Sequence, residues 1–270
     1  MAYDYSDKIF EQNKFLKKPM KNLLCKNWRL VSKYRGIFRK IHNIIKLKSD
    51  TNLASNFEVK LNKNFEEYYD FFKKNHWCFI EDFFTKNTCD EIVNNWPKKF
   101  YFRPMKYISK QYDFGFEWNY KMEKYPKYLN RYQKINKLYD FINSSIFKKA
   151  INNNLCNDDL NRSCFSISLT NAEEGSILFP HKDAISLENK TTSDPAINII
   201  IFLKGIDFQD FSGGTGLYND NEFKKIIFEP NKLNNTALIY KSNKNFFHGF
   251  REIKGKNKIR YTLNTQFTCL

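Results

Sequence analysis

Residues 196–203 of this 270-residue chain read Ala-Ile-Asn-Ile-Ile-Ile-Phe-Leu, a nearly unbroken run of apolar and β-branched side chains. Runs of this length and composition are typical of β-strands that are buried on both faces, because β-branched side chains pack well on a pleated surface. The stretch therefore predicts an interior strand of a sheet that other elements cover on both sides.

Several further strands are predicted around this run, separated by turns that contain Gly, Asn or Pro. Phe165–Thr170 alternates apolar and polar side chains, and residues 211–216 read Phe-Ser-Gly-Gly-Thr-Gly, which indicates a turn or bulge. The remaining candidate strands are Lys224–Phe228, Thr236–Tyr240, Phe246–Phe250 and Ile259–Phe267. Short strands in such a series predict an all-β sandwich or jelly roll for the C-terminal half.

The part of the chain before these strands is expected to be largely helical. His76–Ile80 is a short apolar strand candidate, and Thr85 is a candidate N-cap for a helix over Cys89–Trp96. Gln133–Ala150 predicts a second helix, and the aromatic-rich residues 100–130 are expected to form core and pocket wall. The whole chain is therefore predicted to be an α+β protein.

Residues 1–66 are predicted to be a basic helical extension, followed by one domain over residues 67–270. Asn27–Lys48 places apolar residues at helical spacing between Arg and Lys residues. Such a helix can bind an anionic membrane surface or nucleic acid. More commonly, a helix of this kind packs on its own domain and presents the basic side chains to water.

Charge and composition limit the class of protein. The chain is 41% hydrophobic and 17% aromatic, which excludes a protein that is disordered over its whole length. Its net charge of +16 favours anionic partners, but no zinc-finger spacing or RNA-recognition motif supports nucleic acid among them. None of the six cysteines forms a Cys-x-x-Cys pair, and neither a signal peptide nor an apolar run of about 18 residues is present. These features predict reduced thiols, no transmembrane segment and a cytoplasmic location.

Two of the four histidines stand in a pattern that suits a metal ion. One residue separates His181 from Asp183, so both side chains point to the same side of extended backbone. His248 follows much later, directly after two phenylalanines, as expected at the end of a strand that faces a hydrophobic pocket. Two imidazoles and one carboxylate leave further positions of an octahedral ion open, which is the arrangement of non-haem Fe(II) oxygenases. A structural zinc site would more often use four ligands, usually with Cys.

Arg260 and Thr262 form a second candidate site on the last predicted strand. Alternation along the strand places both on one face. A guanidinium binds a carboxylate bidentately, and the neighbouring hydroxyl adds one hydrogen bond. A buried Arg requires an anionic partner, so the pair predicts a site for the remote carboxylate of a dicarboxylate cosubstrate.

In order and spacing, this pattern resembles the Fe(II)/2-oxoglutarate-dependent dioxygenases, and among them the prolyl-4-hydroxylase-like branch. The resemblance extends from about Trp77 to Leu270 and includes an opening strand and helix, a central strand, a double-glycine turn and the strand before His248. The stretches that carry it are Trp77–Phe84 with Cys89, Ile197–Leu203, Gly213–Tyr218 and Thr236–Tyr240. It implies a double-stranded β-helix (jelly-roll) core with flanking helices.

The resemblance also implies roles for the candidate site residues. His181, Asp183 and His248 match the residues that hold Fe(II) in the family. Arg260 and Thr262 match the residues that bind the remote carboxylate of 2-oxoglutarate. With O2 as the third reactant, the implied reaction is hydroxylation of an unactivated C–H bond, coupled to the decarboxylation of 2-oxoglutarate to succinate.

Two further positions qualify the resemblance. Asn198 matches a position where the family often has an inward polar residue near the cosubstrate. Before the His-x-Asp motif, the family often has a Tyr where this chain reads Leu169–Ala172, so the second contact with 2-oxoglutarate is not identified. Asp183 favours hydroxylation over halogenation, because related halogenases lack this carboxylate.

Other functions remain open at this stage. The chain could be a catalytically silent jelly-roll module that binds an anionic partner, or a zinc hydrolase, although no general base for the latter can be named. For an oxygenase, the open substrate classes are protein side chains, nucleic-acid bases and small anions. A small anion predicts Arg103 or Lys182 at the pocket mouth, and Trp118 is expected on the substrate side of the pocket.

Overall fold

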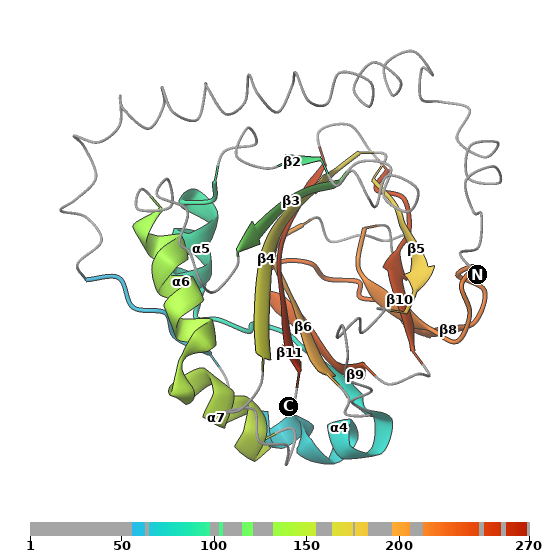
Figure 1. Ribbon diagram of the computed structural model, residues 1–270, viewed down its shortest axis with the longest axis horizontal. Coiled ribbons are helices and arrows are strands. Elements are labelled where there is room, and N and C mark those ends of the chain that lie inside the picture. The colour runs from blue at the N-terminus through green and yellow to red at the C-terminus, as the bar shows by residue number, and fades with distance from the viewer. Residues whose placement is uncertain are drawn as a thin grey trace.

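The computed structural model of the chain describes residues 56–62, 65–97, 103–104, 115–120, 132–154, 164–174, 176–182, 196–205, 213–242, 246–254 and 258–268. Two antiparallel sheets face each other, and helices pack against the larger sheet (Figure 1). The α+β class predicted from the sequence is therefore confirmed.

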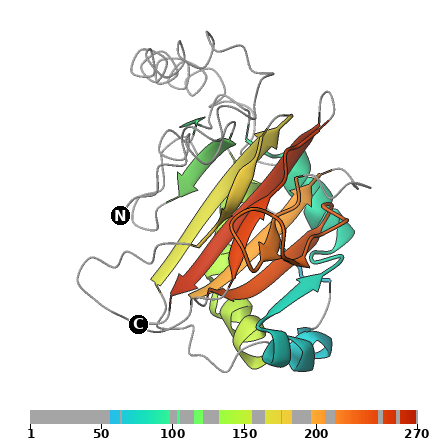
Figure 2. The ribbon, with the colours of Figure 1, turned by 90° about the vertical axis from the view of Figure 1, so that its right-hand side faces the viewer.

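Among the described residues, the larger sheet has seven strands and the smaller sheet has four. In spatial order, the larger sheet consists of β1 (Trp77–Ile80), β9 (Thr236–Ser242), β6 (Ala196–Lys204), β11 (Ile259–Thr268), β4 (Cys164–Glu173), β3 (Gly115–Tyr120) and β2 (Arg103–Pro104). The smaller sheet consists of β5 (Leu178–His181), β10 (Phe247–Phe250), β7 (Gly216–Tyr218) and β8 (Ile226–Phe228). Figure 2 shows β4 and β11 side by side, and they pair over their whole lengths.

The strands predicted from the sequence are present, although some of their ends differ. β4 continues beyond the predicted end at Thr170, because its pairing with β11 extends to Glu173. β8 begins two residues after the predicted start at Lys224. The Asp220 carboxylate accepts hydrogen bonds from the backbone N–H groups of Lys224 and Lys225, which holds both residues in a turn.

The helices cover the face of the larger sheet that points away from the smaller sheet (Figure 1). They are the 3-10 helix η1 (Phe65–Tyr68) and the α-helices α4 (Tyr69–Asn75), α5 (Lys86–Asn94), α6 (Gln133–Asn143) and α7 (Ser145–Asn154). Thr85 caps α5 as predicted, since its hydroxyl accepts a hydrogen bond from the backbone N–H of Thr88.

The single helix predicted over Gln133–Ala150 is wrong, because Ser144 divides it into α6 and α7. Ser144 has extended backbone, with ψ at 154°. Its hydroxyl accepts a hydrogen bond from the backbone N–H of Phe147 at 3.2 Å, which caps the start of the second helix. The second helix also continues past the predicted end at Ala150, to Asn154.

Strand alternation divides the apolar residues between two cores. On β6, Ile197, Ile199 and Ile201 belong to the core beneath the helices, whereas Ile200 and Phe202 belong to the core between the sheets. Full burial of such a side chain stabilises the fold by about 1.5–3 kcal/mol. Because β6 is apolar on both faces, it joins the two cores, and the prediction of a strand buried on both sides is confirmed.

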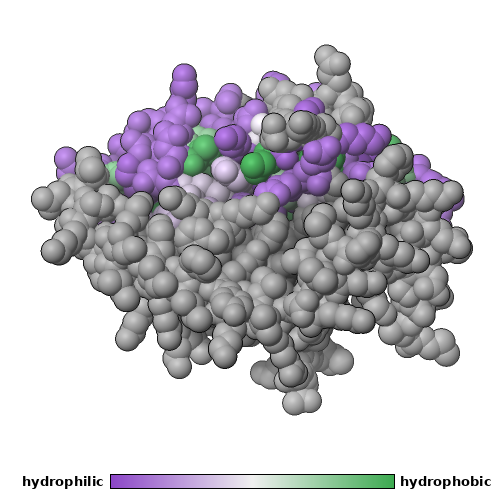
Figure 3. Space-filling model, turned by 90° about the horizontal axis from the view of Figure 1, so that it is seen from above, coloured by the Kyte–Doolittle hydropathy of each residue, from purple (hydrophilic) through white to green (hydrophobic). Residues whose placement is uncertain are grey.

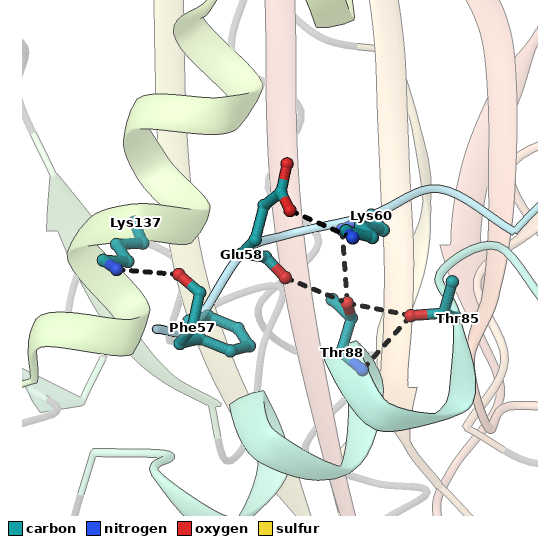
Figure 4. A network of polar contacts seen from close by, with 6 residues as sticks. All are labelled: Phe57, Glu58, Lys60, Thr85, Thr88 and Lys137. Atoms are coloured by element: carbon teal, nitrogen blue, oxygen red, sulfur yellow. Dashed lines mark hydrogen bonds and ion pairs between the residues drawn. The ribbon is translucent and has the colours of Figure 1, made fainter. Parts of the chain in front are cut away.

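The segment 56–62 packs on the domain and is held by polar contacts (Figure 4). The Thr88 hydroxyl of α5 accepts a hydrogen bond from the backbone N–H of Lys60 at 3.2 Å, and the Lys137 ammonium of α6 donates one to the Phe57 carbonyl at 2.7 Å. Phe57 and Val59 are buried in the core beneath the helices. Residues before position 66 thus contribute to the core beneath the helices. The domain boundary at residue 66 stays a prediction.

Several expectations concern parts of the chain that the structure does not describe. The amphipathic helix predicted over Asn27–Lys48 lies outside the described residues, as do Asp183 and residues 105–114. Of the cysteines, Cys78 and Cys89 are buried thiols outside any disulfide, and burial raises the pKa of the Cys89 thiol to about 12. No helix in the described ranges is long and apolar enough to cross a membrane. The described surface that is visible from above is mostly hydrophilic (Figure 3).

Candidate active site

Two histidines lie side by side on neighbouring strands of the smaller sheet. His181 ends β5 and His248 lies on β10, and the two residues are directly paired across the antiparallel strands. Their ring centroids are 4.3 Å apart, with an angle of 50° between the rings. Imidazole nitrogens bind metal ions at about 2.1 Å, so two rings that share one ion must lie this close together. The pair can therefore supply two ligands to a single metal ion.

A backbone hydrogen bond fixes the orientation of the His181 ring. Its Nδ1 lies 3.0 Å from the carbonyl oxygen of Phe179 and donates to it when protonated. This tautomer leaves the Nε2 lone pair available for a metal ion, as in most histidine-bound metal sites. His248 is 8% exposed, and its ring lies 5.6 Å from that of Tyr240.

The local sequence explains how β5 and β10 come so close. A Cβ atom on Gly249 would lie 2.4 Å from the carbonyl oxygen of Leu178 and 2.7 Å from the nitrogen of Pro180. Only glycine permits this approach without a shift of the backbone. Pro180 lacks an N–H group, and β5 tolerates it because β5 is an edge strand of its sheet.

The third predicted metal ligand, Asp183, lies outside the described residues, which end locally at Lys182. Within the described ranges, no group of three His, Cys, Asp or Glu side chains could hold a metal ion. The two histidines are thus the described part of the proposed metal site, and the carboxylate ligand stays a prediction.

Arg260 lies on the face of β11 that points toward the smaller sheet. It is 5% exposed, and its guanidinium lies 3.9 Å from the ring centroid of Phe250 on β10. Its NH1 group donates to the carbonyl oxygen of Gly213 and lies 3.4 Å from the hydroxyl of Thr215. These contacts hold a guanidinium inside the protein, where it can bind a carboxylate with little screening by water.

Thr262 shares this inner face and is fully buried. Its hydroxyl is hydrogen-bonded to that of Thr170, the residue paired with it on β4. Arg260 and Thr262 therefore lie on one face of one strand, and Thr170 adds a second hydroxyl. The sequence did not indicate Thr170, Phe250, Gly213 or Thr215 as parts of the site. For Thr170, the alternation of Phe165–Thr170 was the available signal.

Asn198 also faces inward, but it lies near the other end of the larger sheet. Its partner on β11 is Gln266, six positions after Arg260. At about 3.3 Å per residue, the two positions on β11 are about 20 Å apart. Asn198 and Arg260 therefore lie toward opposite ends of the inner face of the larger sheet.

Lys182 does not line the space between the sheets in this structure. Its ammonium lies 4.6 Å from the ring centroid of Phe247. Lys182 and Phe247 each neighbour one of the two histidines in sequence, so strand alternation places them on the opposite face of the smaller sheet. The side chains of Arg103 and Trp118 lie outside the part of the chain whose side chains are described.

A polar network between β7 and the residues directly after β8 and β10 supports the histidine strand from the side. The buried hydroxyl of Tyr218 donates to the Glu229 carboxylate at 2.7 Å, and Arg251 Nε donates to the same oxygen at 2.7 Å. Burial, followed by the hydrogen bond to Glu229, raises the pKa of Tyr218 far above its usual value. The phenol therefore stays neutral, and the network fixes β10 next to β7.

Comparison with known proteins rests on solved structures. No protein-family model matches the sequence, and no curated protein does so either. An oxidoreductase of the 2OG-Fe(II) oxygenase family from Burkholderia pseudomallei is 10% identical and aligns over 77% of this chain and 92% of its own length, with a TM-score of 0.52. A prolyl 4-hydroxylase from Phytophthora capsici is 13% identical and aligns over 76% of this chain and 63% of its own length, also with a TM-score of 0.52. At these identities the likeness shows a shared fold, which confirms the resemblance at the level of the fold.

Proposed function

We propose that the chain is an Fe(II)- and 2-oxoglutarate-dependent oxygenase that hydroxylates an unactivated C–H bond. The observation that carries the proposal is the pairing of His181 with His248 on neighbouring strands, close to a buried Arg260. Arg260 lies on the facing sheet and contacts Phe250, which is the next inward residue of β10 after His248. A histidine pair and a buried guanidinium are what an iron-bound dicarboxylate requires at its two ends.

The strand order supports a double-stranded β-helix as the scaffold. From β4 to β7, successive strands alternate between the larger and the smaller sheet, and β9, β10 and β11 alternate in the same way. β4, β11, β6 and β9 are neighbours in one sheet, and β5, β10, β7 and β8 are neighbours in the other. Eight strands in two facing sheets of this kind are typical of a jelly roll.

The donor set fits an iron ion of this class. His181 and His248 supply imidazole nitrogens, and we propose Asp183 as the carboxylate, two residues after His181 in the sequence. When bound, Fe(II) with 2-oxoglutarate and O2 supplies the oxidising chemistry, and the products are succinate, CO2 and a hydroxylated substrate. The protein provides the rest: Phe179 orients the His181 ring, and Arg260 and Thr262 fix the remote carboxylate of the cosubstrate.

Anaerobic absorption spectroscopy tests the proposal. Fe(II) and 2-oxoglutarate are added to the wild-type protein, and the metal-to-ligand charge-transfer band is recorded in the visible range. We expect a band in the wild type and none in His248→Ala. His76→Asn is the matched control, because His76 is exposed, is not a proposed metal ligand and has a positive φ of 63° that Asn tolerates. Folded wild-type protein that binds Fe(II) and shows no band would contradict the proposal.

A silent binding module is the second candidate, since the fold alone does not require turnover. It predicts that the protein binds 2-oxoglutarate or another anion without consuming it. Measurement of succinate formed under air, with Fe(II) and 2-oxoglutarate, separates the two functions.

A further inference from the structure

The inner face of the larger sheet carries a patch of four uncharged polar side chains. We define the polar patch as Ser168 on β4, Asn198 on β6, and Asn264 and Gln266 on β11. Asn264 is paired with Ser168, and Gln266 is paired with Asn198. All four lie on the face that Arg260 and Thr262 share, which points toward the smaller sheet.

One buried amide group of the polar patch has no hydrogen-bond partner within the described chain. Asn198 is only 6% exposed, and its Nδ2 atom has no hydrogen-bond partner among the described residues. Buried amide groups in native proteins nearly always have such a partner, so the position indicates that another molecule supplies one. Ser168, Asn264 and Gln266 are half-buried, which leaves the patch open to a ligand from solvent.

Charge decides which class of ligand fits. Among the inward positions of β4, β6, β9 and β11 that the structure describes, Arg260 is the one charged residue, and it lies about 20 Å along β11 from Gln266. An anion in the polar patch would leave water without a charged partner on the larger sheet there, which is costly. Amide and hydroxyl side chains both donate and accept hydrogen bonds, and so do the hydroxyl groups of a neutral ligand.

The size of the polar patch favours a compact ligand. Its members lie on three adjacent strands that are about 4.8 Å apart, and Asn264 and Gln266 are about 7 Å apart along one strand. An extended peptide would cross such a patch within two or three residues, and the described members of the patch would offer it polar contacts alone. A molecule with several hydroxyl groups around one ring can use all four side chains together.

We propose that the polar patch binds an uncharged, polyhydroxylated ring of the sugar class, and that it selects the substrate of this protein. That the bound ring is a substrate rests on the proposed oxygenase function, whereas its binding to the polar patch does not depend on iron. It replaces the anionic small molecule, which the net charge of the chain had suggested, with a neutral one.

Ligand-observed saturation-transfer NMR tests the proposal on the full chain, with and without Zn²⁺ and 2-oxoglutarate. The probes are neutral methyl glycosides, the matching sugar phosphates and uronates, and blocked dipeptide amides. We expect transfer to at least one methyl glycoside and a Kd that rises by about fivefold for each hydrogen-bonding side chain removed in Asn264→Leu and Gln266→Leu. Asn94→Leu makes the same chemical change on the exposed surface of α5 and is expected to leave Kd unchanged. If a leucine variant does not fold, Gln266→Glu takes its place, because it removes the amide donor at constant shape.

Three results would overturn the proposal: no transfer to any neutral glycoside, equal or stronger binding of the anionic sugars or the dipeptides, or glycoside affinity that the patch variants leave unchanged. Titration with iron on the same samples reports on the proposed function separately. Iron binding without glycoside binding overturns the polar patch alone, and glycoside binding without iron binding overturns the oxygenase alone.

Discussion

The space between the two sheets has an apolar half and a polar half. Beneath β7 and β8, the inner positions of β6 and β9 are mainly apolar, and Ile200, Phe202 and Leu238 pack there with Leu217. Beneath β5 and β10, the inner positions of β4 and β11 are polar at nearly every step, from Ser168 and Thr170 to Arg260, Thr262, Asn264 and Gln266. One register runs through both halves, so the contrast comes from side-chain chemistry and not from strand geometry.

The difference shows which half stabilises the fold and which half is available for binding. The outer faces of β4 and β11 are as well buried as those of β6, since Leu169, Leu263 and Phe267 belong to the core beneath the helices. The inner face of the same strands therefore carries polar side chains at several successive inward positions where apolar side chains would stabilise the fold more. Sites that depart from the apolar pattern in this way are where function is expected.

The largest effect is expected from substitutions within one row of residues that runs across the larger sheet, from the apolar half to the polar half. Leu238, Ile200 and Asn264 are neighbours across β9, β6 and β11. Leu238→Asn places an amide in the apolar half and is expected to lower the free energy of unfolding by about 3 kcal/mol or more. Asn264→Leu is expected to change it by less than about 1 kcal/mol. Chemical denaturation measures both, and equal losses would show that the two halves do not differ.

Arg260→Met removes the charge from the polar half while its volume is kept. We expect the affinity for 2-oxoglutarate, with Zn²⁺ in place of iron, to fall by about 30-fold or more, because charge-assisted hydrogen bonds to a carboxylate are lost. Cooperative unfolding should be retained, since a buried charge contributes little net stability. Calorimetric titration measures the affinity. An unchanged Kd would remove Arg260 from the cosubstrate site.

Gly249→Ala tests whether the close approach of β5 and β10 is needed for metal binding by the two histidines. Its new Cβ would meet backbone atoms of Leu178 and Pro180, so β5 and β10 must move apart. We expect a loss of about 1–3 kcal/mol in the free energy of unfolding and weaker binding of metal. Gly205→Ala is the contrasting variant, because its Cβ would meet the side chain of Leu233, away from both histidines. Equal effects of the two changes on metal affinity would contradict this role.

The smallest effect is expected at the turn before β8, which borders the apolar half. Burial alone would raise the pKa of Asp220, but hydrogen bonds from the backbone of Glu222, Lys224 and Lys225 lower it below 3.8 overall. Its ionised form thus stabilises the fold above this pH, and the stabilisation is lost as the pH falls through the lowered pKa. The stability difference between wild type and Asp220→Asn should shrink from pH 7 to pH 3. A constant difference would contradict this assignment.

The fold was largely predictable because alternation and apolar runs are local signals. The run at residues 196–203 predicted β6, and Thr85 predicted the start of α5. Ser144 shows the limit: a serine within a helical pattern can point to solvent or cap a new helix, and only the packing of Phe147 and its neighbours decides between the two.

The site was predictable where residues close in sequence act together and less so elsewhere. Arg260 and Thr262 follow from alternation on one strand. The pairing of His181 with His248 depends on the register of β5 against β10, and the partners of Arg260 come from a turn far away in the sequence. The polar patch likewise required the register of three strands, which no single segment encodes.

Crystallography of the chain with Mn²⁺ and 2-oxoglutarate under anaerobic conditions tests the central claim most directly. Anomalous diffraction at the manganese edge locates the metal independently of any assumption about its ligands. The account predicts one ion bound to His181 and His248, with the remote carboxylate of 2-oxoglutarate on Arg260 in the polar half. An ion that contacts neither histidine, or a dicarboxylate bound away from Arg260, would contradict it.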